Sequence, residues 1–187
     1  MDRYWLLTWT TYGTWLPGDE RGFVSQVSDG DGGKTIHNRP QTLYDADWDL
    51  LRHSMQAKLK QSPIRLIREQ AEAALAQLKE TATYRQWQLV AAAVMANHCH
   101  IVVAVVGDPD PSHILRDFKS YASRALNQKW PKPTAGTWWT ESGSKRKLKN
   151  EQAILGAAAY VRDQEFPLVT WIRTEFLAEL GPRRERE

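Results

Sequence analysis

Hydrophobic residues follow two different spacings along this chain, and the spacings predict its elements. Residues 4–12, YWLLTWTTY, are rich in aromatic and β-branched types that favour a strand. Apolar residues recur at helical spacing over 64–78 and again over about 113–128. Between these helices, the apolar runs 84–95 and 98–106 are separated by a two-residue turn. That spacing predicts a β-hairpin.

The remaining pattern completes a recognisable order of elements. Ser112 is expected to cap the helix that follows it, a fourth strand is expected within 136–148, and Asn150 is expected to cap a last helix ending near Gln164. The order strand, helix, strand, strand, helix, strand predicts an α+β fold. We expect a ferredoxin-like βαββαβ antiparallel sheet with helices on one face, plus a C-terminal helix.

The region between the first strand and the first long helix reads differently. Residues 13–62 carry clusters of glycine, proline and aspartate, such as GTWLPGDERG and SDGDGG, with a short helix possible within 45–61. A connection of this length is unusual in a compact domain. We therefore predict one domain over 1–187 with a long irregular insertion at about 13–62.

Composition narrows the class of protein. A hydrophobic content of 42% is enough for a core, and no stretch resembles a membrane span or a signal peptide, so a cytoplasmic protein is expected. The single cysteine, Cys99, excludes an internal disulfide framework and a multi-cysteine zinc site. The net charge of +3 permits nucleic-acid binding without requiring it.

Two of the five histidines lie together in MANHCHIVV, residues 95–103. Side chains alternate along a strand, so His98 and His100 share one face while Cys99 and Ile101 point to the other, toward the helices. The two imidazoles are close enough to converge on one cation, although metal chemistry needs a third protein ligand. Polar residues on an exposed sheet face are the alternative interpretation.

The last helix offers groups that could complete such a site. In NEQAILGAAAYVRDQ, Tyr160 and Gln164 are four residues apart and lie off the centre of the apolar stripe. One turn earlier, Gly156 and Ala157 leave the surface around the phenol bare. A glycine inside a helix costs about 1 kcal/mol relative to alanine. Close approach of another chain would explain it, and chance is the alternative.

These residues carry a resemblance to a known family. The chain resembles the single-tyrosine HUH transposases, especially the REP-associated tyrosine transposases related to insertion-sequence enzymes. The resemblance covers most of the chain except residues 27–62. It rests on four stretches: TWTTYGTWLPGDERG, MANHCHIVV, FKSYASRALN and GSKRKLKNEQAILGAAAYVRDQ.

The resemblance implies a chemistry for the paired histidines and the tyrosine. His98, His100 and Gln164 would hold a divalent cation, Mg²⁺ or Mn²⁺, and Tyr160 would attack single-stranded DNA near a hairpin to leave a 5′-phosphotyrosine. The first stretch, TYGTWLPGDERG, could help to read the hairpin. The expected DNA contacts are basic residues: Lys119, Arg124, Lys145, Arg146, Lys147 and Lys149.

Several alternatives stay open at this point. Tyr121 is a competing nucleophile, although it falls on the apolar stripe of its helix, and Asp108 and Asp110 are possible extra ligands in what looks like a turn. An inactive, host-adopted protein that only binds hairpin DNA is the main alternative function. A metal hydrolase with a structural Tyr160 is a third. The family includes dimers and monomers, so either state is possible.

Overall fold

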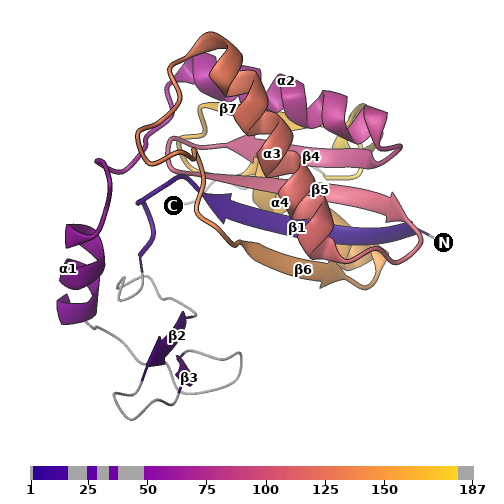
Figure 1. Ribbon diagram of the computed structural model, residues 1–187. Coiled ribbons are helices and arrows are strands. Elements are labelled where there is room, and N and C mark those ends of the chain that lie inside the picture. The colour runs from indigo at the N-terminus through magenta and orange to yellow at the C-terminus, as the bar shows by residue number, and fades with distance from the viewer. Residues whose placement is uncertain (1, 17–24, 29–33, 38–48, 181–187) are drawn as a thin grey trace.

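The computed structural model of the chain describes residues 2–16, 25–28, 34–37 and 49–180. A five-stranded antiparallel sheet forms its centre, with strand order β6-β1-β5-β4-β7 (Figure 1). The sheet strands are β1 (Asp2–Thr10), β4 (Gln88–Val94), β5 (His98–Val106), β6 (Ser144–Leu148) and β7 (Val169–Ile172). The helices around it are α2 (Arg68–Tyr84), α3 (Pro111–Lys129), α4 (Glu151–Arg162) and the short α5 (Thr174–Leu177).

The predicted βαββαβ order is confirmed. The elements β1, α2, β4, β5, α3 and β6 follow one another along the chain, and their strands take the ferredoxin-like spatial order with β1 and β5 at the centre. The residues after Gln164, for which the sequence predicted no element, add β7 beside β4 at the sheet edge and then α5.

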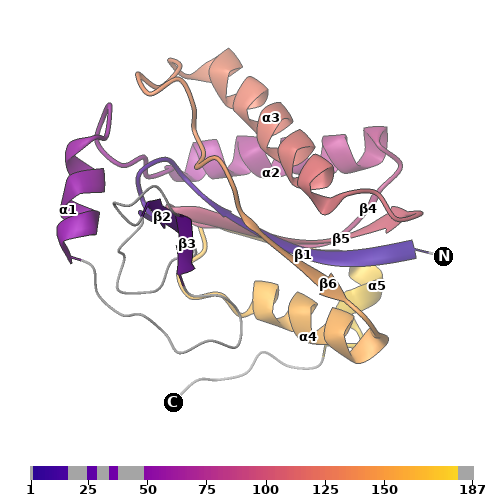
Figure 2. The same cartoon turned by 60° about the horizontal axis from the view of Figure 1, so that its bottom comes forward.

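The helices form two layers of unequal size. Helices α2 and α3 cover one face of the sheet, and α4 lies across the other (Figure 2). The larger core lies under α2 and α3 and contains Trp9, Ile101 and Phe118, all fully buried. The smaller core lies under α4, where Ala158 and Val161 meet Val102. Because side chains alternate along β5, its odd-numbered residues fill the larger core and its even-numbered residues face α4.

Two predicted element ends are corrected. Asp110, not Ser112, is the N-cap of α3: its carboxylate accepts a hydrogen bond from the Ser112 backbone N–H at 2.8 Å. The proline at the next position, Pro111, suits the first helical turn, where its missing N–H is no loss. The last helix begins after the predicted cap, Asn150, but ends at Arg162, so Gln164 lies just beyond it.

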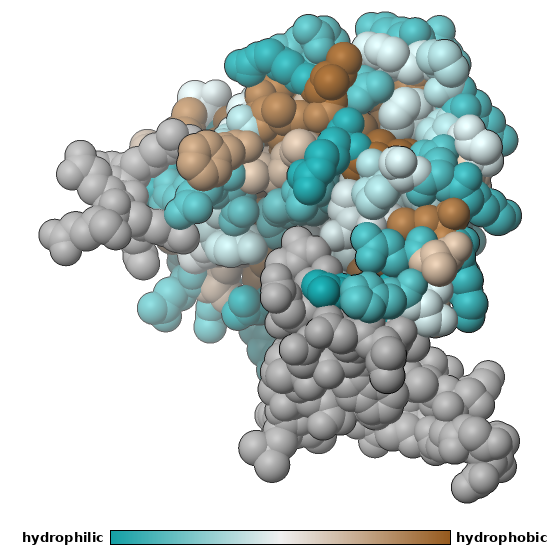
Figure 3. Space-filling view, turned by 90° about the vertical axis from the view of Figure 1, so that its left-hand side faces the viewer, coloured by the Kyte–Doolittle hydropathy of each residue, from teal (hydrophilic) through white to brown (hydrophobic). Residues whose placement is uncertain are grey.

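The described parts of the predicted insertion form small elements. Strands β2 (Ser25–Ser28) and β3 (Lys34–His37) pair with each other, and α1 (Asp49–Ala57) stands to one side of the sheet (Figure 1). Figure 3 looks at the end of the molecule where β1 ends and β5 begins, and hydrophobic side chains lie exposed there among hydrophilic ones. Within the residues that the structure describes, no helix is long and apolar enough to cross a membrane.

Candidate active site

The paired histidines open β5 on the face that α4 covers. Their register with β1 places Thr10 opposite His98 and Thr8 opposite His100. The two imidazole rings lie edge to face, with centroids 4.7 Å apart. Both rings therefore sit close enough for one cation to reach a nitrogen of each.

Each ring has its Nδ1 atom engaged by a neighbour. His98 Nδ1 lies 2.7 Å from Asn97 Oδ1, and because an amide oxygen only accepts, the imidazole donates. His100 Nδ1 shares a hydrogen bond of 2.7 Å with the Thr8 hydroxyl, which can accept in the same way. These contacts favour the tautomer with the proton on Nδ1 of each ring and Nε2 unprotonated, which is the form that binds metal.

The environment of His100 keeps its ring neutral. The residue is only 5% exposed. Burial, and to a smaller extent the neighbouring His98, lowers the pKa of His100 to about 4 from its ordinary value of 6.5. At neutral pH its imidazole is therefore uncharged and can donate an electron pair.

Helix α4 brings Tyr160 to this pair. The phenol oxygen lies 3.5 Å from His100 Nε2, longer than an ordinary O–H···N hydrogen bond, and the two rings are 5.1 Å apart. Tyr160 remains 44% exposed, because the small residues Ala157 and Ala158 are what α4 packs against the sheet. The phenol thus lies beside the imidazoles and stays open to solvent.

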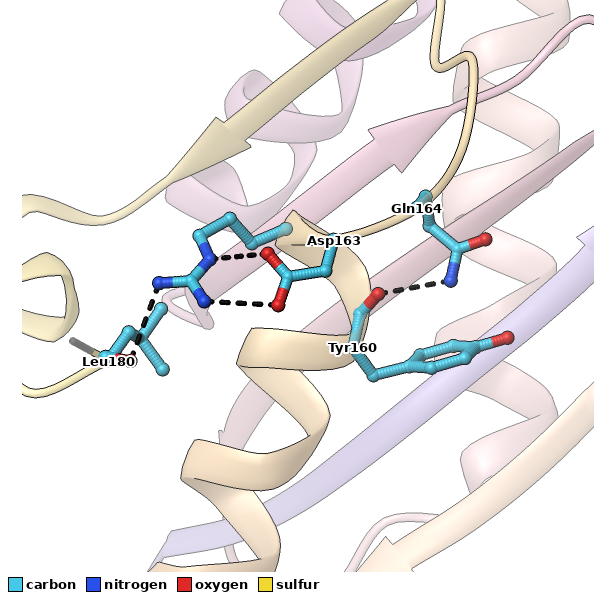
Figure 4. Close-up of polar contacts among 5 residues, drawn as sticks. Tyr160, Asp163, Gln164 and Leu180 are labelled. Carbon is cyan, nitrogen blue, oxygen red and sulfur yellow. Dashed lines mark hydrogen bonds and ion pairs between the residues drawn. The ribbon is translucent and has the colours of Figure 1, made fainter. Parts of the chain in front are cut away.

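The end of α4 is fixed by an ion pair on the side away from the phenol. Arg162 binds the Asp163 carboxylate at 2.7 and 3.0 Å and reaches the Leu180 carbonyl at 3.4 Å (Figure 4). On the other side, Gln164 Nε2 donates to the Tyr160 carbonyl at 3.0 Å. Figure 4 shows Gln164 and Tyr160 projecting to the same side. Because the amide nitrogen is engaged with the backbone, the amide oxygen is left as the group that could bind a cation.

The donor set fits a divalent cation only if an amide oxygen takes part. Among the described residues, no group of three His, Cys, Asp or Glu side chains is placed to hold a metal. Two imidazoles and the Gln164 oxygen leave positions for phosphate and water, as Mg²⁺ or Mn²⁺ requires. Cys99 cannot contribute, because it is fully buried in the opposite core and burial raises the pKa of its thiol.

The alternative groups lie elsewhere. Asp108, beyond the far end of β5, pairs with Arg3 at 3.5 Å and Lys147 at 3.3 Å, and Asp110 caps α3. Tyr121 lies on α3, across the sheet from the histidines, with its ring 4.9 Å from the Arg124 guanidinium carbon. Tyr121 is half-buried and is not among the buried residues of α3, so its predicted packing role stays a prediction.

The basic run on β6 is divided between the two faces of the sheet. Lys147 lies opposite Trp5 and Lys145 lies opposite Leu7, so both side chains lie on the face that α3 covers. Arg146 lies opposite Leu6, so its side chain lies on the face that carries the histidines. All of these side chains are exposed, as is Lys149 just after the strand. Arg146 is therefore the member of the run that shares a face with Tyr160.

The two basic residues predicted on α3 differ from each other. Arg124 is exposed, whereas Lys119 directs its ammonium group at the backbone carbonyls of Thr140, Glu141 and Ser142, the last two at 2.8 and 3.0 Å. Burial lowers the pKa of Lys119 to about 8. A DNA phosphate at Lys119 would have to compete with these carbonyls. The segment LPGDERG of the first resembling stretch lies largely outside the described residues.

Sequence reasoning missed the groups that orient the histidines. The sequence predicts only a turn at residues 96–97, although the position of Asn97 directly before His98 is a usable signal. Thr8 gave no signal, because its partnership with His100 depends on the register of two strands far apart in the chain. Thr170 on β7 lies opposite Ala93, which lies opposite His100, and its buried hydroxyl has no hydrogen-bond partner among the described residues.

Comparison with known proteins assigns the family. The family model described as "Transposase IS200 like" matches residues 53–164, more than half of the chain. A similar solved structure is a REP-associated tyrosine transposase bound to a REP hairpin, with 13% identity and a TM-score of 0.44, over 85% of this chain and 64% of that one. The chain thus spans under two thirds of that protein's length.

A second similar structure is a candidate transposase from Deinococcus radiodurans R1, with 16% identity and a TM-score of 0.44, over 89% of this chain and 93% of that one. No curated protein matches the chain. The family match includes the paired histidines, Tyr160 and Gln164. This chain belongs to the IS200-like transposase family.

Proposed function

We propose that this protein is a metal-dependent single-stranded DNA endonuclease and strand transferase that cuts at or near a hairpin and forms a 5′-phosphotyrosine through Tyr160. The observation that carries the proposal is the distance of 3.5 Å between the Tyr160 phenol oxygen and His100 Nε2, beside a second imidazole. A tyrosine placed only for packing would not need its hydroxyl beside one imidazole that is itself paired with a second imidazole.

The reaction conserves a phosphodiester bond. The Tyr160 oxygen forms a bond to phosphorus, the bond from phosphorus to the 3′ oxygen breaks, and that oxygen takes up a proton to leave as a 3′-hydroxyl. Reversal of the step on another 3′-hydroxyl joins strands without ATP, because the phosphotyrosine retains the bond energy. The exposure of Tyr160 supports this role, since the attacked strand and the departing proton both need access.

The side chains around Tyr160 prepare it for attack. A cation held by His98, His100 and the Gln164 oxygen, either Mg²⁺ or Mn²⁺, would polarise the scissile phosphate and stabilise its developing charge. Thr8 and Asn97 hold the imidazoles in place. A free phenol has a pKa near 10, so it must lose its proton in or before the attack. Neutral His100, with its low pKa, is better suited to ligation than to keeping that proton.

The DNA strand is expected to approach along the side of the sheet that carries the site. Arg146 is the basic residue we place nearest to it. Lys145, Lys147 and Arg124 would contact phosphates farther along a hairpin that reaches round the edge of β6, with Lys149 and Lys119 as weaker candidates. Since Tyr160 lies against the histidine of its own chain, we assign the attack to the same subunit.

The test is covalent capture. Hairpin oligonucleotides with single-stranded flanks, labelled at the 5′ or the 3′ end, are incubated with the protein and Mn²⁺ and resolved under denaturing conditions. We expect protein attached to the fragment that carries the 3′ label, lost in Tyr160→Phe and retained in the matched control Tyr121→Phe. Binding without cleavage would identify a hairpin-binding protein, and cleavage without the adduct would identify a hydrolase.

A mixing experiment tests the subunit assignment. Tyr160→Phe and His100→Ala are combined in equal amounts, each inactive alone. Attack within one subunit predicts that the mixture stays inactive, whereas recovery of the adduct would show that tyrosine and histidine come from different subunits.

A further inference from the structure

Phe166, two residues beyond Gln164, is held in a costly conformation. Its side chain is 91% exposed. Its backbone has a φ of +51°, a left-handed conformation that bulky residues rarely adopt. It also precedes Pro167, whose ring further restricts the residue before it. The strained backbone opposes folding and the exposed ring contributes almost no burial in return, which suggests a use for the ring outside the folded chain.

The other left-handed residue of this kind has an ordinary explanation. Gln86, with a φ of +56°, lies just after α2, where Trp87 N–H closes the helix end by donating to the Ala82 carbonyl at 2.8 Å. At the end of α4, the Asp163 N–H already donates to the Ala159 carbonyl at 2.9 Å, three residues before Phe166. The conformation of Phe166 therefore lies outside the helix cap.

The loop that carries Phe166 is held by a hydrogen bond on each side, and the first of these lies at the candidate active site. On one side Gln164 bonds to the Tyr160 carbonyl. On the other side Leu168 N–H donates to the Val94 carbonyl at 3.0 Å, and Val94 lies opposite Cys99, between the two histidines. Two residues of chain span at most about 7 Å. The Cα of Phe166 thus lies within that distance of the Cα atoms of both Gln164 and Leu168, at the border of the site.

We infer that Phe166 is a DNA-positioning residue whose ring stacks on an unpaired base next to the phosphate that Tyr160 attacks. This inference rests on the proposed function. Every base offers a flat face, and an exposed ring beside a single strand stacks on it whatever the sequence. A stacked base would fix the flanking nucleotide and so hold the scissile phosphate in register with the phenol.

A contact with a second protein chain is the competing use, and the loop argues against it. Specific protein interfaces bury a continuous surface of about 800 Å² on each partner. Pro167, Leu168 and Val169 after the ring are half-buried, with Leu168 and Val169 packed against the core under α2 and α3, and Glu165 before it is polar, so Phe166 presents a single exposed apolar side chain. One isolated aromatic ring beside a nucleic-acid site matches a base better than it matches a protein surface.

The experiment measures base stacking separately from cleavage. The probe is a DNA hairpin with a thymidine flank in which 2-aminopurine replaces one flanking base at a time, so that stacking on the protein quenches its fluorescence. Binding is measured without metal in wild type, Phe166→Ala, Phe166→Leu and Phe166→Trp. Tyr84→Ala is the matched control, since Tyr84 is an aromatic residue 74% exposed at the end of α2, in the other helix layer.

We expect Phe166→Ala to weaken binding by about 5- to 150-fold and to abolish the quenching at one flanking position. Phe166→Leu should behave like alanine, because it keeps an apolar side chain without a ring face, and Phe166→Trp should bind as wild type. Tyr84→Ala should change neither quantity. Binding of Phe166→Ala within twofold of wild type, with quenching retained, would overturn the inference.

Two further results separate this inference from its rivals. If Phe166→Ala leaves DNA binding unchanged but converts a dimer to a monomer in sedimentation, the ring contacts a second copy and the inference is wrong. If wild type binds with the Phe166-dependent quenching yet forms no adduct with Mn²⁺, the stacking stands and the proposed cleavage fails. If Phe166→Ala and wild type form the adduct equally well, the proposed cleavage stands and the stacking role of Phe166 fails.

Discussion

The two faces of β5 show how one strand serves two purposes. On the α2 and α3 side, Cys99, Ile101 and Val103 are completely buried in a core that includes Trp9 and Phe118. On the α4 side, the strand is covered at Val102 by small residues of α4, and its first positions carry the histidines instead. The large core makes the fold stable, so the thinner layer can hold polar groups beside an exposed tyrosine.

The layer of α4 is the thinner one, and polar contacts order the part of it that surrounds the histidines. The layer of α2 and α3 is the thicker one, and it is held mainly by apolar contacts. Thr8, Asn97 and the Arg162–Asp163 pair fix the side chains and the helix end around the site. A site built in this way keeps its geometry without burying Tyr160. The comparison therefore predicts large stability effects on one face and large functional effects on the other.

The largest effect is expected for a truncation in the thick layer. Phe118→Ala removes a fully buried ring that packs 5.4 Å from the Trp87 ring, and should lower the free energy of unfolding by about 3–5 kcal/mol. Tyr160→Ala removes a similar volume from the open face and should cost less than about 1 kcal/mol. Urea denaturation of both variants checks this. Equal losses would show that the two layers contribute alike.

Protonation of His100 at low pH is expected to lower the free energy of unfolding by roughly 3 kcal/mol at most. Its pKa is about 4 in the folded chain and 6.5 when unfolded, so the unfolded chain binds the proton first as pH falls. Stability should therefore be highest above pH 6.5 and should decline between pH 6.5 and 4. The measurement is urea denaturation across this range with a chelator present. The difference between wild type and His100→Gln isolates the histidine, and parallel curves would contradict the prediction.

Much of this architecture was predictable from local sequence. The bounds of the strand 98–106 agree with the structure because alternation and apolar content are local properties, and the βαββαβ order followed from them. Strand β7 was missed because it has only four residues and pairs with β4, far earlier in the chain. The capping of α3 was misassigned because Asp110 and Ser112 both suit an N-cap, and only geometry separates them.

The sequence predicted that His98, His100 and Tyr160 lie together, and the structure places them side by side. Their unusual positions in their own elements drew attention to them, whereas their chemical roles came from the family resemblance and stay predictions. Thr8 requires the β1–β5 register, which no local pattern supplies. The exposure of Phe166 depends on how the described segments pack around the loop after α4, which no local pattern supplies. Residues that act through partners distant in the chain are the ones that sequence reading misses.

A smaller effect, confined to the thin layer, is expected at Thr8. Thr8→Val keeps the shape of the side chain but removes the hydroxyl that holds His100 Nδ1, and should weaken Mn²⁺ binding about 10- to 100-fold. Thr10→Val is the control, since Thr10 lies two residues away on the same strand and its hydroxyl lies 2.9 Å from the Thr140 hydroxyl. Isothermal titration with Mn²⁺ gives both affinities. Equal weakening in the two variants would mean that the hydroxyl does not position the ring.

The smallest effects are expected from replacing a glycine by alanine, once in each layer. At Gly156 in α4, an added Cβ meets nothing within 4 Å, so Gly156→Ala should stabilise the protein by about 1 kcal/mol. At Gly143 the added carbon would lie 2.5 Å from the Thr8 carbonyl oxygen and 3.1 Å from Trp9 Cβ, so Gly143→Ala should destabilise. Thermal unfolding measures both signs, and a loss at Gly156 would contradict the prediction. If Gly156→Ala raises stability but lowers adduct formation, DNA or another chain approaches α4 at the position that this glycine keeps open.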